Sequence, residues 1–179
     1  AKHIGARTIG TASPGKHDRL RAHGLDVAID YRRADWPEEV MKATDSMGVD
    51  LITDPLGSKS WKAGYNLLRH CGRLGMFGAS EMSSSGPFAK LGMVKTALQM
   101  PFYHPIKLLD KNRSVFGLNL GHLWHEGARM NSWMQEILKG YEQGWVRPHV
   151  DKVFTFSQAA EAHRYMEERK NFGKVILTP

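Results

Sequence analysis

Ser13 and Lys16 are the residues of this chain whose types and spacing are best suited to binding a phosphate group. They lie in the stretch ARTIGTASPGKHDR, where an apolar run ends and a helix-start signal follows at once. Ser13 is a good N-cap, and Pro14 suits the first helical position, where a missing N–H costs nothing. The turn therefore offers a hydroxyl, helix N-terminal amides and a lysine at the carboxyl end of a predicted strand, an arrangement that attracts phosphate.

The residue that ends this strand also bears on the type of dinucleotide. In an open α/β sheet, a site for NAD places Asp or Glu there to hold the ribose 2′-hydroxyl, and this chain has Ser13. A carboxylate would repel a 2′-phosphate, whereas Ser13 and Lys16 favour one. The alternative is that Ser13 and Pro14 only cap a helix and that Lys16 is a solvated surface charge.

The segments around this turn alternate between β-branched runs and helical patterns. Strands are predicted at residues 6–12, 26–31, 49–53, 73–78, 113–120, 150–156 and 173–178. Helices are predicted at residues 13–23, 35–48, 58–72, 88–99, 105–109 and 126–143, with a last one capped by Ser157. The first four strands and three helices follow one another through short connections, which indicates a parallel sheet with helices on both faces.

The first predicted strand does not fit the centre of such a sheet. A doubly wound sheet of the dinucleotide-binding type has strand order 3-2-1-4-5-6, so its first strand lies in the middle. If residues 6–12 form the second strand, the first strand and its glycine-rich turn should precede Ala1, and residues 1–6 should end the first helix. We therefore expect an α/β, Rossmann-type parallel sheet that lacks its first strand, followed by a C-terminal αβ tail, in a chain that begins inside a longer protein.

Composition excludes several classes of protein. With 179 residues, 41% hydrophobic and 24% charged, the chain is long enough for one domain with a core, or one domain and part of another. No apolar run reaches the length of a membrane span, nothing resembles a signal peptide, and a single Cys71 excludes an internal disulfide framework. These features predict a cytoplasmic protein. The net charge of +7 comes from scattered residues, which favours an anionic small molecule over nucleic acid.

Motifs for metal or hydrolytic chemistry are not found. One cysteine cannot build a thiolate cluster for zinc, and no His-Glu-x-x-His occurs, so we predict no metal site. His122 and His125 in HLWH could share a helix face, but such a pair alone is no metal site. No G-x-S-x-G motif for a serine hydrolase is present either.

Several segments together resemble a known family. They are GTASPGKHDRLRAHGLDVAIDYR, GVDLITDPLG, YNLLRHCGRLGMFG, LLDKNRSVFGLNLGHL, GYEQGWVRPHVDKVFTF and NFGKVILTP. The chain resembles the medium-chain dehydrogenase/reductase superfamily, and within it the zinc-independent quinone oxidoreductase branch and its VAT-1-like subgroup. The resemblance covers nearly the whole chain. It implies a Rossmann domain over residues 1–144 and, over residues 145–179, a segment that returns to a catalytic domain lying mostly before Ala1.

The resemblance also implies an activity. NADPH would be the hydride donor, and the small-molecule substrate would be a quinone or an α,β-unsaturated carbonyl. Hydride transfer of this kind needs little from side chains, so the catalytic residues stay unknown and the 179 residues alone are expected to be inactive. A homodimer paired through strands near residues 115–120 is also implied.

Eleven residues match cofactor contacts of the family. Ser13 and Lys16 match contacts to the 2′-phosphate, in agreement with the local argument. The others match contacts along the rest of the dinucleotide: Tyr31 near the adenosine ribose, Gly57 and Ser58 on the adenine side, Phe77, Gly78 and Ala79 at the nicotinamide ribose, and Leu118, Asn119 and Leu120 at the carboxamide. Each has a simpler interpretation: Tyr31 as sheet packing, Gly78 as a turn glycine and Asn119 as a polar loop residue.

A non-catalytic alternative comes from a different class. A protein could keep the reductase fold and bind lipid or a membrane surface instead, which would make peripheral membrane contact possible. Its support is the basic charge balance, the apolar segment at residues 88–109 and the vesicle association that the resemblance implies. Met-rich and aromatic surfaces of this kind are more often core or a subunit contact, which is the alternative for this segment.

Overall fold

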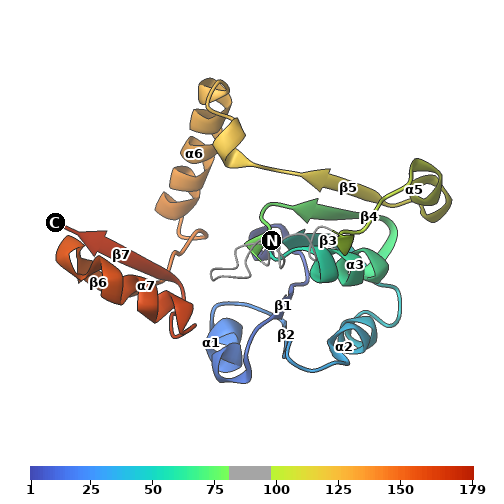
Figure 1. Ribbon diagram of the computed structural model, residues 1–179, viewed down its shortest axis with the longest axis horizontal. Coiled ribbons are helices and arrows are strands. Elements are labelled where there is room, and N and C mark those ends of the chain that lie inside the picture. Colours follow the sequence, from blue (N-terminus) through green and yellow to red (C-terminus); the bar gives the residue numbers. More distant parts are fainter. Residues whose placement is uncertain (81–97) are drawn as a thin grey trace. The chain divides into compact units, whose positions relative to one another are not determined.

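A computed structural model of the chain describes residues 1–80 and 98–179, which alternate between strands and helices (Figure 1). The strands are β1 Ile9–Thr11, β2 Val27–Ile29, β3 Val49–Asp54, β4 Leu68–Met76, β5 Ser114–Gly117, β6 Val150–Thr155 and β7 Lys174–Thr178. The α-helices are α1 His17–Ala22, α2 Trp36–Ala43, α3 Ser58–Leu67, α5 Pro105–Lys111, α6 Gly127–Glu142 and α7 Ala159–Glu167. Short 3₁₀ turns occur at Lys2–Ile4, Pro14–Lys16, Leu120–His122 and Phe156–Gln158. Most of the helix predicted at residues 88–99 lies outside the described residues.

The chain forms two compact units, which we describe one at a time. The first comprises Ala1–Lys2 and Ala6–His125, and the second comprises His3–Gly5 and Glu126–Pro179. The division falls before α6, whereas the division expected from the sequence falls after this helix, at residue 144. The assignment of residues 145–179 to a catalytic domain stays a prediction.

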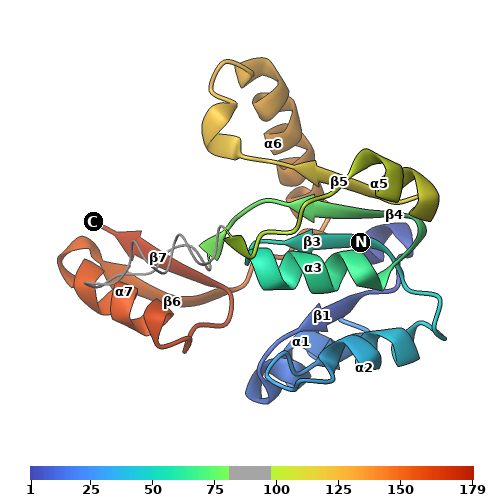
Figure 2. The ribbon, with the colours of Figure 1, turned by 45° about the vertical axis from the view of Figure 1, so that its right-hand side comes forward.

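The strands of the first unit are all parallel. β1 pairs with β2, and β3, β4 and β5 form a three-stranded sheet in that order, with α3 against it (Figure 2). In the part of the chain that the structure describes, β1 has no strand on its second side, and β3 is a sheet edge. This pattern is the predicted order 3-2-1-4-5-6 with its central place empty, so the Rossmann-type fold class is confirmed.

Apolar side chains from both sets of strands meet in one cluster. Ile29, Val40 and Leu67 are its buried members, and partly buried residues from β1, β2, α2 and β3 pack against them. A fully buried Leu68 and Leu74 extend the core along β4, and burying a leucine side chain contributes about 1.5–3 kcal/mol. The two-stranded and three-stranded sheets are therefore held in one unit by packing rather than by strand pairing.

The boundary between α3 and β4 differs from the prediction. Gly72 was expected to end a helix, with a strand starting at Arg73, but α3 ends at Leu67 and β4 starts at Leu68. Leu68 is buried and pairs with Val49, and the chain then bulges, with Cys71 at φ +63°. Strand pairing has therefore overridden the local signal of a helix-terminating glycine.

The second unit is built on a parallel pair, β6 and β7, with α7 packed against it. Phe154 and Ala162 are buried, and Asp151 accepts hydrogen bonds from the Tyr165 hydroxyl at 2.9 Å and the Phe172 N–H at 3.0 Å. Ser157, the predicted cap of the last helix, is not its N-cap. Thr155 and Gln158 instead form a capping box around the 3₁₀ turn Phe156–Gln158 that precedes α7.

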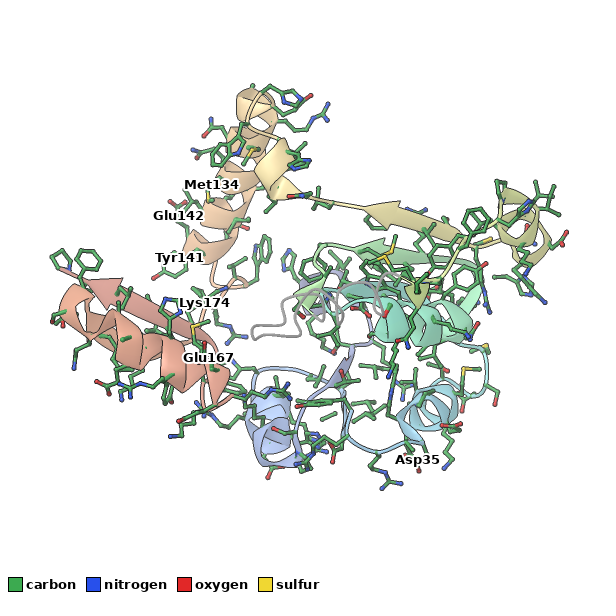
Figure 3. All side chains as sticks on the ribbon, viewed as in Figure 1. Asp35, Met134, Tyr141, Glu142, Glu167 and Lys174 are labelled. Carbon is green, nitrogen blue, oxygen red and sulfur yellow. The ribbon has the colours of Figure 1, made fainter. Side chains whose placement is uncertain are left out.

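Helix α6 leaves much of its apolar face exposed. Met134 and Tyr141, two turns apart and both labelled in Figure 3, are among the exposed large hydrophobic residues of this helix. No helix among residues 1–80 and 98–179 is both long enough and apolar enough to cross a membrane.

Candidate cofactor-binding site

The predicted site residues fall into two groups at the carboxyl ends of parallel strands. The β1–β2 edge group consists of Ser13, Lys16 and Tyr31. The β3–β5 edge group consists of the residues that follow the other three strands: Gly57, Ser58, Phe77, Gly78, Ala79, Leu118, Asn119 and Leu120. Carboxyl ends of parallel strands are where ligands bind in open α/β sheets, so each group has the placement that a dinucleotide site requires.

The β1–β2 edge group follows a paired strand end. Thr11 pairs with Ile29, and the Ala12 N–H donates to the Ile29 carbonyl oxygen at 2.9 Å, so the turn after β1 starts beside the end of β2. Ser13 is extended, at φ −66° and ψ 145°, and Pro14 begins the 3₁₀ turn that leads into α1. Ser13 thus occupies the N-cap position and Pro14 the first helical position, as predicted.

The Ser13 side chain, however, makes no capping hydrogen bond. The turn is closed by main-chain atoms instead, since the Lys16 N–H donates to the Ser13 carbonyl oxygen at 2.9 Å. The Ser13 hydroxyl therefore does not cap the helix, as the simpler interpretation required. This observation weakens the simpler alternative for Ser13 and fits a hydroxyl that meets an anion.

The negative charge of Asp30, which lies near this turn, is balanced by neighbouring basic groups. Asp30, at the end of β2, accepts three hydrogen bonds from the Arg32 guanidinium, two at 3.0 Å and one at 3.3 Å, and these bonds lower the pKa of Asp30. His17 Nε2 donates to the Ala12 carbonyl oxygen at 2.9 Å, and its position also lowers the pKa of Asp30. Tyr31 is 38% exposed beside this pair, so solvent or a ligand can reach its ring.

The β3–β5 edge group is connected by main-chain hydrogen bonds between neighbouring turns. The Phe77 N–H donates to the Asp54 carbonyl oxygen at 3.2 Å, and the Ser80 N–H donates to the Pro55 carbonyl oxygen at 3.1 Å. The Leu118 N–H donates to the Met76 carbonyl oxygen at 2.9 Å. The three predicted segments after β3, β4 and β5 therefore lie side by side at one edge.

Backbone conformation explains two residue types in this group. Gly57 has φ +143° and ψ −155°, a conformation open almost only to glycine, and Ser58 after it is buried at the start of α3. A Cβ at Gly78 would lie 2.9 Å from the Pro55 carbonyl oxygen, so only glycine lets the turn after β4 approach the turn after β3 this closely. Gly78 is thus a turn glycine and a member of the predicted site at once.

Asn119 has a local role that limits what its side chain can do. Its Oδ1 accepts the Gly121 N–H at 3.0 Å and caps the 3₁₀ turn Leu120–His122. Leu118 and Leu120 on either side are exposed. The Leu118 N–H and the Asn119 and Leu120 carbonyl oxygens are already hydrogen-bonded within the fold. The main-chain contact predicted for a carboxamide would therefore fall to the other polar main-chain atoms of this segment.

Sequence reasoning missed Asp54, which is 5% exposed at the end of β3. One carboxylate oxygen accepts the Leu56 N–H at 2.7 Å, and the other accepts the Ser60 hydroxyl. The signal was present, because Asp followed by Pro and Gly is typical of a turn in which the carboxylate bonds to the main chain two residues on.

The arrangement suits a nicotinamide dinucleotide better than it suits a metal. The β1–β2 edge group offers a hydroxyl and a cation, and the β3–β5 edge group offers glycine-shaped main-chain turns. No group of three or more His, Cys, Asp or Glu side chains able to hold a metal ion occurs among the residues described, and Cys71 is an exposed free thiol. The donors in this part of the chain therefore do not fit a zinc ion.

Comparison with known proteins agrees with this arrangement. A sequence model of the family described as "Zinc-binding dehydrogenase" matches residues 23–177. The synaptic vesicle membrane protein VAT-1 homolog of Danio rerio is 38% identical over 170 residues, which cover 95% of this chain and 35% of the relative. This chain therefore spans well under half of that relative's length.

Solved structures match the fold over the whole chain. An NAD-dependent alcohol dehydrogenase is 31% identical with a TM-score of 0.76, covering 100% of this chain and 46% of that one. A mycobacterial quinone oxidoreductase is 26% identical with a TM-score of 0.73, covering 100% of this chain and 51% of that one. A mycobacterial protein complexed with NADPH is 24% identical with a TM-score of 0.77, and the match covers 100% of this chain and 52% of that chain. At this identity the match shows a similar fold and nothing more.

Proposed function

This chain belongs to the zinc-binding dehydrogenase family of the medium-chain dehydrogenase/reductase superfamily, and on that basis we propose that it forms the cofactor-binding part of an NADPH-dependent oxidoreductase. The substrate of the proposed enzyme is a quinone, as the name of one solved relative suggests, or an α,β-unsaturated carbonyl, as the resemblance to the quinone oxidoreductase branch implies. Residues 1–144 form the dinucleotide-binding domain in this proposal, and residues 145–179 return to a catalytic domain.

One observation carries the choice of NADPH over NADH. Ser13 stands where an NAD site has a carboxylate, its hydroxyl is not used for capping, and Lys16 follows in the same turn. A 2′-phosphate carries about two negative charges at neutral pH, so a hydroxyl donor and an ammonium group stabilise it. The pairing of Asp30 with Arg32 lowers the repulsion that the phosphate would meet there.

The remaining residues would bind and orient the rest of the cofactor. Tyr31 would lie near the adenosine ribose, and Gly57 with Ser58 on the adenine side. Phe77, Gly78 and Ala79 would border the nicotinamide ribose, and the main chain of Leu118, Asn119 and Leu120 would meet the carboxamide. Bound NADPH would supply a hydride, and the substrate would take up a proton from a donor or from water. The protein's part is to hold the ring at the right distance and angle and to exclude water.

The proposed reaction is zinc-independent, as in the quinone oxidoreductase branch that the sequence resembles. We also propose a cytoplasmic homodimer that pairs through β5, since β5 is the outer strand of its sheet in the described part of the chain. A mass near that of one polypeptide in light scattering would overturn the dimer.

The direct test is NADPH oxidation by the complete polypeptide that carries this chain, followed by absorbance with a panel of quinones and enones. We expect turnover with at least one of them, and a weaker apparent affinity for NADH than for NADPH. Residues 1–179 alone should give no turnover. Failure of the complete polypeptide to bind either nucleotide would overturn the proposal.

A second candidate function is supported by an exposed apolar surface on the first unit. Leu98, Phe102, Ile106 and Leu109 are all more than half exposed, Phe102 at 83%, and Lys107 and Lys111 lie in the same helix or at its end. Apolar side chains beside lysines suit contact with an anionic lipid surface. The rest of the predicted apolar segment, residues 88–97, lies outside the described residues.

The two candidates predict different results. If lipid binding is the function, the complete polypeptide should sediment with vesicles containing anionic lipid, and Phe102→Ser with Leu109→Ser should abolish this without changing NADPH binding. Sedimentation that is unaffected by the double substitution would reject this surface. Cofactor turnover without vesicle binding would favour the reductase.

A further inference from the structure

We propose that Asp54 is the positioning residue that holds the turns after β3 and β4 in register for the cofactor, an inference that rests on the proposed function. The carboxylate is 5% exposed and lies where β3 ends, yet it belongs to neither edge group. A buried carboxylate is costly unless hydrogen bonds satisfy its oxygens. In Asp54 each oxygen has a donor of its own, so the carboxylate joins the two segments that supply those donors.

The first donor fixes the path of the turn after β3. The Leu56 N–H lies 2.7 Å from Oδ1, which closes an Asx-type turn around Pro55. The chain then passes through Gly57 in its glycine-only conformation and enters α3. Loss of this bond would leave the turn after β3 free to change its path.

The second donor ties the same carboxylate to the first turn of α3. The Ser60 hydroxyl donates to Oδ2, while the Trp61 N–H donates to the Gly57 carbonyl oxygen at 2.8 Å. Strand end, turn and helix start are therefore joined through one side chain. Movement of α3 against β3 must break a charge-assisted hydrogen bond, which is among the stronger kinds in proteins.

The turn after β3, which Asp54 fixes, also supports the turn after β4. The main-chain oxygen atoms of Asp54 and Pro55 accept the Phe77 and Ser80 N–H groups, and Gly78 packs against Pro55 with no room for a Cβ. The segments proposed for the adenine side and for the nicotinamide ribose thus share one support. Loss of the Asp54 carboxylate should shift both segments, although Asp54 is not among the residues proposed to contact the cofactor.

The test uses the complete polypeptide with Asp54→Asn, and Asp50→Asn as the matched control. Asp50 lies on the same strand, and its side chain is 83% exposed, so this control makes the same chemical change away from the turns. Asparagine keeps the size of the side chain but cannot accept bonds at both terminal atoms. We expect Asp54→Asn to weaken NADPH binding by about 10- to 100-fold, and Asp50→Asn to leave it unchanged.

Half-molecules of the cofactor separate positioning from simple destabilisation. If Asp54 supports both turns, Asp54→Asn should lower the affinities for 2′,5′-ADP and for nicotinamide mononucleotide alike. Both affinities would be measured by titration at a temperature where the variant is fully folded. A second observable is coupling: Asp54→Asn and Gly78→Ala should be non-additive for NADPH binding, because both act on the same turn contact. Should Asp54→Asn fail to fold, Ser60→Ala removes one of the two donors. It should lower the affinities for both half-molecules by a smaller factor.

Each outcome decides the matter. Normal binding of all three ligands by folded Asp54→Asn overturns the role of Asp54 but leaves the proposed function standing. A lower melting temperature with unchanged binding of the folded protein makes Asp54 merely structural, which also overturns it. No NADPH binding by the unsubstituted protein overturns the proposed function, and the positioning role with it.

Discussion

The two edge groups are built in different ways. In the β1–β2 edge group, the proposed contacts come from side chains: Ser13 and Lys16 extend from a turn closed by its own main-chain hydrogen bond, and Tyr31 follows β2. In the β3–β5 edge group the main chain is the working part, and glycines, a buried serine and the Asp54 carboxylate set its path. We therefore expect one substitution to change the preferred ligand of the first group, whereas the second should resist change because its parts share contacts.

This difference suits the two ends of a dinucleotide. The presence of a 2′-phosphate is the feature that distinguishes one cofactor from another, and side-chain charge is an adaptable way to recognise it. The nicotinamide end is the same in both cofactors and must be held within a small range of positions for hydride transfer. Substitutions in the β1–β2 edge group should therefore change specificity, and substitutions in the β3–β5 edge group should change binding of every cofactor.

The largest effect that would sharpen this contrast is expected from Gly57→Ala. At φ +143° and ψ −155° an alanine is strained by about 1–3 kcal/mol, and relief of that strain moves the turn after β3. We expect a lower melting temperature and a loss of about 10-fold or more in affinity for NADPH and NADH equally, measured by titration of the complete polypeptide.

Gly127→Ala is the matched control for this substitution. An added Cβ there meets no atom within 4 Å, and Gly127 is not among the glycines with positive φ. It should leave stability and binding near those of the unsubstituted protein. A Gly57→Ala variant that loses NADPH but keeps NADH would break the contrast, because the β3–β5 edge group would then be selective.

Next in size is Lys16→Ala, which should act on specificity. Removal of the ammonium group that would contact the 2′-phosphate should lower the affinity for NADPH by about 10-fold or more and leave the affinity for NADH nearly unchanged. Lys16→Arg should keep most of the preference. Lys42→Ala, an exposed lysine of α2 paired with Glu39, is the control and should change neither affinity. Equal losses for both nucleotides would remove Lys16 from the phosphate site.

The sequence predicted the features that arise from local pattern. The alternation of strands and helices, the order of the parallel strands and the missing pairing between β1 and β3 could all be inferred, because periodicity and turn residues decide them. The clustering of the β3–β5 edge group followed from the same topology. Ser13 and Pro14 were placed correctly as the start of a turn.

What could not be predicted depends on contacts between distant segments. The early start of β4 is set by Leu68 pairing with Val49, and the close approach of Gly78 to Pro55 is a tertiary contact. Asp54 looked like an ordinary turn residue, since only the folded strand shows that its carboxylate is buried and shared between a turn and a helix. Thr155 was passed over for Ser157 because both suit an N-cap and their spacing alone does not choose between them.

The smallest expected effect comes from the opposite end of the β1–β2 pair. Asp26 accepts hydrogen bonds from Lys2 Nζ at 2.7 Å and from the Thr8 N–H at 2.7 Å, and these bonds lower its pKa to about 2, from 3.8. Because the folded-state pKa lies below the unfolded value, the stabilisation is fully present above pH 3.8 and is lost as the pH falls towards 2. The pair is solvent-exposed, so its contribution is modest.

Asp26→Asn should therefore lower the melting temperature slightly at pH 7, and the difference from the unsubstituted protein should disappear as the pH approaches 2. Asp50→Asn, with an exposed carboxylate on β3, is the control and should show a smaller difference at neutral pH. Asp26 lies at the amino end of β2, away from Ser13 and Lys16, so the ratio of NADPH to NADH affinity should stay the same. A changed ratio would mean that specificity depends on how β1 and β2 are held together, and the β1–β2 edge group would then work through its backbone as the β3–β5 edge group does.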